Sequence, residues 1–155
     1  MKILMVCLGN ICRSPMAQGI AEHKIAKKGL NVFVDSAGTS DYHIDKAPDP
    51  RAIKKSAEYG IDISNYRGRQ LEKKDFETFD RIFVMDTSNY ENAVSLTEDP
   101  DEIKKVEMIL NLSQPNTNMS VPDPYYGAED GFENVFRLLD AACDVLIEEI
   151  ESEEA

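Results

Sequence analysis

Apolar positions along the chain predict strands and helices in alternation. Residues 2–7 predict a central strand, because side chains on both of its faces are apolar, as in a parallel sheet. Between residues 17 and 25 the apolar positions recur at helical spacing. Pro15 suits the first turn of this helix, and Gly29 suits its end. Residues 31–36 predict a second strand, which completes a strand–helix–strand unit.

The remainder of the chain continues this alternation. The pattern predicts a helix over 50–59 and then a strand over 81–86. A helix over 88–96 and a helical turn over 100–105 lead to a strand over 106–110. The last element is a long amphipathic helix over 132–150. This order predicts an α/β fold: one domain over residues 1–155, with a four-stranded parallel sheet flanked by helices on both faces.

Several polar residues and two long loops fall at one edge of the predicted sheet. Cys7, Ser36 and Asp86 come at the carboxyl ends of strands, where ligands bind in parallel sheets. The loops over 37–50 and 113–127 are long enough to suggest a functional role. We therefore expect the functional site at this edge.

The charge of the chain limits its partners. The net charge is −12, from 17 basic and 29 acidic residues, which disfavours nucleic acids and anionic membranes. Five glutamates lie in the tail at about 148–155, which we expect to be a solvated, fraying helix end. No apolar run has the length of a membrane span, and the N-terminus does not have the pattern of a signal peptide, so we expect a cytoplasmic protein.

Three cysteines, Cys7, Cys12 and Cys143, do not suggest a disulfide framework. An odd number of thiols instead fits a reducing compartment. Cys143 falls on the apolar stripe of the last predicted helix, so we expect it to be structural. No cysteine or histidine belongs to a Cys/His cluster, so we expect no metal site.

The loop after the first strand has the features of a reactive phosphate site. Backbone N–H groups in a strand-to-helix loop can surround an anion, and the helix N-terminus adds a favourable field. Gly9 allows positive φ and close approach of a ligand, while Asn10 tolerates left-handed geometry and can pin the loop. The Arg13 guanidinium can bind two phosphate oxygens. The same field favours the thiolate of Cys7, and Ser14 can donate a hydrogen bond to that sulfur.

The Cys-x5-Arg spacing of Cys7 and Arg13 is weak by itself. A tight strand-to-helix turn around a buried structural cysteine is the simpler interpretation. The preceding apolar strand, the glycine and asparagine inside the loop, and the following Pro15 favour the phosphate site. The Gly-Lys-Ser/Thr ending of a Walker-type nucleotide loop is absent.

Two sequence blocks resemble the low-molecular-weight protein tyrosine phosphatases. Residues 6–15, Val-Cys-Leu-Gly-Asn-Ile-Cys-Arg-Ser-Pro, match the family's N-terminal signature, and residues 123–126, Asp-Pro-Tyr-Tyr, match its general-acid loop. Smaller matches are found over 35–39, over 49–51 and at 85–86. The resemblance extends over essentially the whole chain and implies the family's fold and hydrolase activity.

The resemblance also implies roles for individual residues. Cys7 would attack phosphorus to form a phosphocysteine, and Arg13 with the loop amides would bind the phosphoryl oxygens. Ser14 would assist release of the thiolate. Asp123 would protonate the leaving phenolate and then activate water. Independently, a carboxylic acid between Pro122 and Pro124 is suited to supply that proton, although an Asp-Pro pair can also simply start a turn.

The remaining site residues support the loop or line its entrance. The resemblance implies that Asn10 and Ser36 brace the loop, and that Leu8, Ile11, Tyr42, Tyr125 and Tyr126 wall the entrance, with Gly9 and Cys12 in the phosphate loop itself. In many members a histidine helps to hold the loop asparagine, and Tyr66 occupies the corresponding place here. Cys7 and Cys12 form a reversible disulfide, as in some members, or Cys12 is only a small residue that packs under the loop.

We expect a protein tyrosine phosphatase that needs no cofactor or metal. Its partners would be phosphotyrosine-containing proteins, with inorganic phosphate as the product, and it would be a monomer or weak dimer. A thioredoxin-coupled arsenate reductase shares the fold, but it needs further cysteines after the third strand, and residues 81–100 contain none. A non-catalytic phosphate-binding module would be expected to lose Cys7 or Asp123, and both are present.

Overall fold

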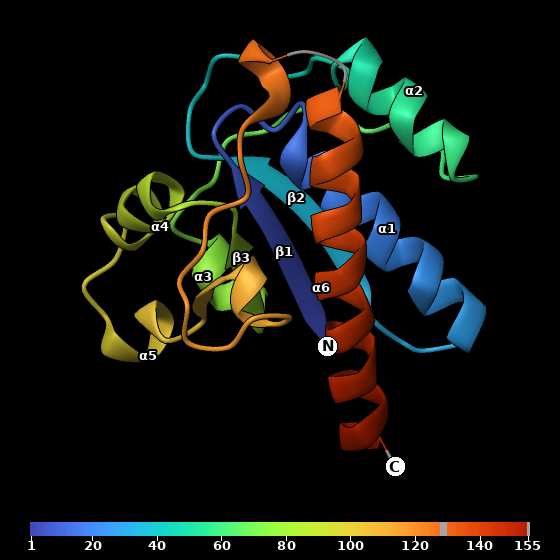
Figure 1. Ribbon diagram of the computed structural model, residues 1–155. Helices are drawn as coiled ribbons and strands as arrows, with labels where there is room; N and C mark the ends of the chain where they lie inside the picture. The colour runs from blue at the N-terminus through green and yellow to red at the C-terminus, as the bar shows by residue number, and fades with distance from the viewer. Residues whose placement is uncertain (128–129, 155) are drawn as a thin grey trace.

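Four parallel strands form one sheet with the order β2-β1-β3-β4 in the computed structural model, which describes residues 1–127 and 130–154 (Figure 1). The strands are β1 (Lys2–Cys7), β2 (Phe33–Gly38), β3 (Arg81–Val84) and β4 (Val106–Met108). Cys7 lies opposite Gly38 of β2, and Val6 lies opposite Val84 of β3. The carboxyl ends of the three longest strands therefore meet at one edge of the sheet.

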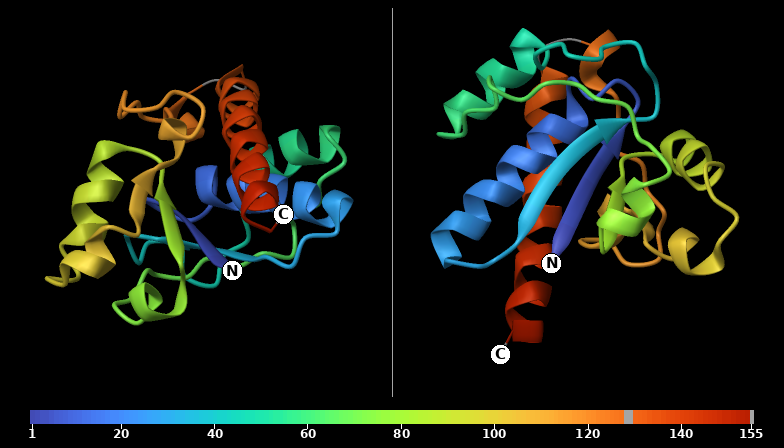
Figure 2. Two further views of the ribbon diagram at one scale, coloured as in Figure 1. Left: turned by 90° about the horizontal axis from the view of Figure 1, so that it is seen from below. Right: turned by 180° about the vertical axis from the view of Figure 1, so that it is seen from behind.

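Helices cover both faces of the sheet, as the sequence predicted (Figure 2). One face packs against α1 (Arg13–Lys28) and α6 (Asp130–Glu154), with α2 (Pro50–Glu58) beside them. The other face packs against α3 (Asp75–Thr78) and α4 (Thr87–Val94), followed by α5 (Pro100–Ile103). Alternate residues of β1 enter the two cores: Met5 faces α1 and α6, whereas Leu4 faces the α3 side. This explains why the strand is apolar on both faces.

The predicted elements are confirmed in type and order, with shifts at their ends. Helix α1 includes Pro15 in its first turn and ends at Gly29, whose φ is 65°. Strand β4 is shorter than predicted, because a 3-10 turn, η1 (Ile109–Asn111), begins at Ile109. The long loop over 113–127 contains a second 3-10 turn, η2 (Pro124–Tyr126).

The acidic tail is helical, and the fraying expected for it stays a prediction. The helix α6 continues to Glu154. The carboxylate of Glu149 accepts a hydrogen bond from Arg81 at 2.9 Å, and Glu151 lies 3.7 Å from Lys28. These pairs tie the tail to the body of the domain, while the side chains of Glu149 and Glu151 keep 44% and 41% of their surface exposed. Within residues 1–127 and 130–154, no helix is both long and apolar enough to cross a membrane.

Candidate active site

The loop over residues 8–12 joins β1 to α1 at the carboxyl edge of the sheet (Figure 1). Hydrogen bonds from the loop after β2 hold it in place: Thr39 N–H donates to the Cys7 carbonyl at 2.9 Å, and Ser40 N–H donates to that of Leu8 at 3.0 Å. A Cβ at Gly38 would lie 2.8 Å from the Leu8 carbonyl oxygen, which is closer than side chains approach backbone. The end of β2 can therefore pass under the loop only as glycine.

The side chain of Asn10 holds the loop from inside. Asn10 has a φ of 58° and is almost fully buried. Its Oδ1 accepts from the Arg69 backbone N–H at 3.1 Å, and this fixed donor sets the orientation of the amide. Its Nδ2 then donates to Ser14 Oγ at 2.8 Å and to Ser36 Oγ at 3.0 Å. Ser36 in turn donates to Gln18 of α1 at 2.6 Å, so one amide joins the loop to β2 and α1.

Two of the sequence expectations for the loop are wrong. The positive φ expected at Gly9 occurs at Asn10 instead. At Gly9, a Cβ would lie 2.9 Å from the His43 ring, so a larger residue there would displace that side chain. Tyr66 does not support Asn10 among the described hydrogen bonds. Its hydroxyl donates to Glu22 on α1 at 2.5 Å, so the support expected from this side chain comes from the backbone of the nearby Arg69.

Cys7 is the last residue of β1, and its sulfur lies 3.0 Å from Ser14 Oγ. Ser14 Oγ already accepts a hydrogen bond from Asn10, so its own hydroxyl hydrogen is available for the sulfur. A hydroxyl that donates to sulfur stabilises the thiolate relative to the thiol. Cys12, just before α1, makes no side-chain cap with the helix N-terminus. The amide groups of the first turn are thus not satisfied by a capping side chain.

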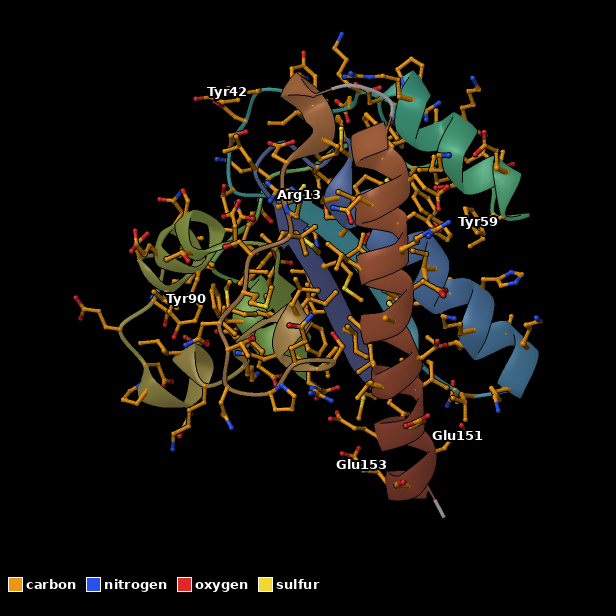
Figure 3. All side chains as sticks on the ribbon, viewed as in Figure 1. Arg13, Tyr42, Tyr59, Tyr90, Glu151 and Glu153 are labelled. Atoms are coloured by element: carbon orange, nitrogen blue, oxygen red, sulfur yellow. The ribbon has the colours of Figure 1, made fainter. Side chains whose placement is uncertain are left out.

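Arg13 is anchored on two sides. Its Nη1 donates to Asp86 Oδ2 at 2.8 Å and to the Val121 carbonyl at 2.8 Å, and only 2% of the residue is exposed. Asp86 is itself fixed, because it caps α4 by accepting from Asn89 N–H at 2.7 Å. The sequence placed Asp86 at the sheet edge but gave it no role. Figure 3 shows Arg13 at the carboxyl end of the sheet, where these segments meet.

The segment that carries Asp123 is tied to the same edge. The Val121 N–H donates to the Met85 carbonyl just after β3 at 2.7 Å. Two residues further on, Asp123 caps η2 by accepting from Tyr125 N–H at 3.0 Å. Its Oδ2 lies 3.6 Å from Arg13 Nη2, and about 30% of its side chain is exposed. A carboxyl group that is separated by 116 positions from Cys7 in the sequence therefore faces the same hollow.

A small pocket of about 50 Å³ opens over the loop. It is lined by Cys7, Leu8, Gly9, Ile11, Cys12, Arg13, Tyr42, His43, Asp123 and Tyr125. Asn10, Ser14 and Ser36 are buried and are not part of this lining. Tyr42 extends outward at the rim (Figure 3). His43, which follows Tyr42 in the loop after β2, also lines the pocket, as its place in the sequence suggested. The side chain of Tyr126 lies outside the described residues.

The other two cysteines are buried thiols. Burial, together with the charge of Asp49, raises the pKa of Cys12 well above its usual range. Burial raises the pKa of Cys143 to about 12, and this side chain lies in the core against α1, as predicted. All three cysteines are free. The Cys7–Cys12 redox pair stays a prediction. Within the described residues, no group of three or more His, Cys, Asp or Glu side chains is arranged to hold a metal ion.

Comparison with known proteins gives a consistent result. Residues 2–155 match the family described as low molecular weight phosphotyrosine protein phosphatase. The low molecular weight phosphotyrosine protein phosphatase of Schizosaccharomyces pombe is 39% identical over 134 residues, which cover 84% of this chain and 85% of the relative. A crystal structure of a protein tyrosine phosphatase from Entamoeba histolytica, with Hepes in the active site, has a TM-score of 0.92 at 36% identity and covers 100% of this chain and 99% of its own. The Drosophila arginine phosphatase has a TM-score of 0.86 at 32% identity, with 96% and 97% covered.

Replacing Asn10 separates the two contributions that this residue makes to the loop. Asn10→Ala removes the amide hydrogen bonds and also places a Cβ without polar compensation at positive φ, a conformation that costs roughly 1–2 kcal/mol. Asn10→Gly removes only the hydrogen bonds. We expect both variants to lower the free energy of unfolding, measured by urea denaturation, and the alanine variant to be the less stable by about 1 kcal/mol. Equal stability of the two variants would show that backbone geometry contributes nothing.

Proposed function

The chain belongs to the low molecular weight phosphotyrosine protein phosphatases, and we propose that Cys7, Arg13 and Asp123 carry out its hydrolysis of phosphotyrosine. One observation carries the assignment. A nucleophile at the end of β1, a buried guanidinium at the start of α1 and a carboxyl group on a distant loop line one pocket. Neither the sulfur of Cys7 nor the carboxyl group of Asp123 would by itself indicate a phosphatase. Together they supply the attacking atom and the acid for the leaving group.

In the first step the Cys7 thiolate attacks phosphorus, so that a P–S bond forms while the P–O bond to the phenol breaks. Arg13 is held by Asp86 and the Val121 carbonyl, which presents a fixed positive charge to the equatorial oxygens. The loop amides and the N-terminus of α1 add donors on the same side. Asp123 gives its proton to the departing phenolate oxygen, which avoids a poor anionic leaving group.

In the second step water attacks the phosphocysteine and the P–S bond breaks. Asp123, now a carboxylate, accepts a proton from that water, and inorganic phosphate leaves. Ser14 donates to the departing sulfur at the 3.0 Å separation seen here, which stabilises the thiolate as it is released. Asn10 and Ser36 act through the loop, because they hold Ser14 and the backbone in place.

The alternative arsenate reductase is not favoured. Its chemistry passes oxidation between cysteines, and Cys143 lies in the core between α6 and α1, away from the pocket lining. A non-catalytic binding module has no need for a carboxyl group at the pocket. We further propose that the enzyme acts in the cytoplasm as a monomer or weak dimer. The free thiols and the negative net charge support the reducing compartment and disfavour nucleic-acid partners.

Single substitutions should separate the nucleophile from the acid. We expect Cys7→Ser to abolish turnover of p-nitrophenyl phosphate but to keep phosphate binding, measured by calorimetry. Asp123→Ala should lower turnover of phenyl phosphate by roughly 10²-fold or more, because that poor leaving group needs the proton. Cys143→Ala is the matched control, since it removes a thiol outside the pocket, and it should keep normal turnover. Full activity of Cys7→Ser would overturn the mechanism.

The pocket wall favours an aryl substrate. Leu8, Ile11, Tyr42 and Tyr125 offer apolar and aromatic surface around the loop, which suits the ring of phosphotyrosine. We expect kcat/KM for a phosphotyrosine peptide to exceed that for the same peptide with phosphoarginine by at least about tenfold, the discrimination that such pockets provide. Phosphate release from the two peptides measures it. A preference for phosphoarginine would refute the substrate class while leaving the role of Cys7 intact.

A further inference from the structure

We propose that Arg51 is a positioning residue, which clamps the segment carrying Asp123 to the phosphate loop and so places the acid over the leaving group. The proposal rests on the function proposed above, in which Asp123 is the acid. Arg51 is outside the pocket lining, so it would act through the backbone of η2 and not on the substrate.

The clamp is fixed first to the phosphate loop. The Asp49 backbone N–H donates to the carbonyl of Ile11, in the middle of that loop, at 2.8 Å. The Asp49 side chain is 8% exposed and caps α2 by accepting from Arg51 N–H at 2.9 Å. Hydrogen bonds from Arg51 hold the pKa of Asp49 below its usual range, against the opposite effect of burial. Asp49 is thus a charged and rigid point of attachment for the guanidinium of Arg51.

The guanidinium of Arg51 then reaches across to the other segment. Its Nε donates to Asp49 Oδ1 at 3.0 Å and its Nη2 to Oδ2 at 2.9 Å, a bidentate pair that fixes the plane of the group. The same Nη2 donates to the Tyr125 carbonyl at 3.0 Å, and Nη1 lies 3.5 Å from the Gly127 carbonyl. One side chain therefore binds a carboxylate beside the phosphate loop and two carbonyls at the end of η2.

Aromatic rings restrict the guanidinium further. Its central carbon lies 4.9 Å from the ring centroid of Phe132 and 5.6 Å from that of Tyr125. Phe132 is buried near the start of α6. In Figure 1 the orange turn of η2 lies at the same end of the molecule as the N-termini of α2 and α6. Arg51 sits where these three elements meet.

The backbone of η2 transmits this position to the acid. Asp123 accepts from Tyr125 N–H at 3.0 Å, and Arg51 donates to the carbonyl of that same residue. A shift of Tyr125 therefore moves the carboxyl group of Asp123. On the other side of Asp123, the segment is tied to the sheet only through Val121 among the backbone hydrogen bonds described for residues 119–123. Arg51 supplies an anchor on the other side of Asp123.

A leaving-group series tests the clamp. We expect Arg51→Ala to lower kcat/KM for phenyl phosphate by roughly tenfold or more, because that poor leaving group needs the proton. For p-nitrophenyl phosphate, whose phenolate leaves readily, the loss should stay within about threefold. Arg51→Lys keeps the charge but not the fork, so it should show the same selective loss. If Arg51→Ala folds poorly, the lysine variant carries the test alone.

Two controls separate positioning from structure. Arg137→Ala removes another arginine–carboxylate pair, in which the exposed Arg137 binds Glu133 of α6, and should leave kcat/KM unchanged for both substrates. The inhibition constant of inorganic phosphate should change less than about twofold in Arg51→Ala, because the phosphate loop keeps its own hydrogen bonds. A general structural defect would instead lower kcat/KM for both substrates by the same factor and weaken phosphate binding.

A double-mutant cycle links the two residues. In Asp123→Ala, a further Arg51→Ala change should cause no additional loss with phenyl phosphate, because there is no acid left to position. If the losses in kcat/KM of the two single variants multiplied in the double variant, or if Arg51→Ala lowered kcat/KM equally for both substrates, the clamp would be overturned and the proposed function would stand. If Asp123→Ala alone had no effect, the proposed function would fail first, and the clamp with it.

Discussion

The hydrogen bonds of the Asn10 amide are the contact on which the rest of the site depends. They hold a residue at positive φ in the middle of the phosphate loop, and they orient Ser14 so that its hydroxyl faces the Cys7 sulfur. The amide can do this because its carbonyl oxygen is committed to a backbone N–H, which leaves both amide hydrogens for the two serines. Buried polar groups that are all satisfied make a rigid cradle, and a rigid cradle binds a phosphoryl group without reorganising.

The Arg13 guanidinium extends this order from the loop to the other half of the sheet. It joins the first turn of α1 to Asp86 after β3 and to the Val121 carbonyl on the acid segment. The same few contacts therefore fix the phosphate-binding group and one end of the loop that carries Asp123. The parallel topology makes this possible, since it brings the carboxyl ends of β1, β2 and β3 to one edge.

The sequence predicted local features well and long-range contacts poorly. The strand-loop-helix unit around Cys7 is contiguous, so its apolar pattern and its glycine, asparagine and proline were enough to predict it. Asp123 is remote: the pattern placed its loop at the functional edge, but its role in the site came mainly from the resemblance of its block to a known family. Tyr66 failed for the opposite reason: a matching place in the sequence did not reveal that its hydroxyl would bond Glu22. The donor that supports Asn10 is a backbone N–H, which every residue except proline has, so the sequence could not identify it.

The C-terminal tail is a second place where the sequence did not reveal long-range contacts. The acidic composition of the tail predicted a solvated helix end, but not the ion pairs that its glutamates form with Arg81 and Lys28. Those partners are more than sixty residues away from the tail in the sequence, and composition alone does not contain such information. Composition still gave the correct solvent exposure of the tail, because charged side chains avoid the core wherever the fold places them.

The central claim is that the sulfur of Cys7 carries the phosphoryl group between two displacements. The most direct measurement is rapid quenching of the enzyme during turnover of an aryl phosphate, in alkaline denaturant, followed by peptide mass spectrometry to locate any bound phosphate. The mechanism predicts a phosphorylated peptide with the modification on Cys7. Phosphate on any other residue, or turnover at full rate with no phosphorylated Cys7, would contradict it.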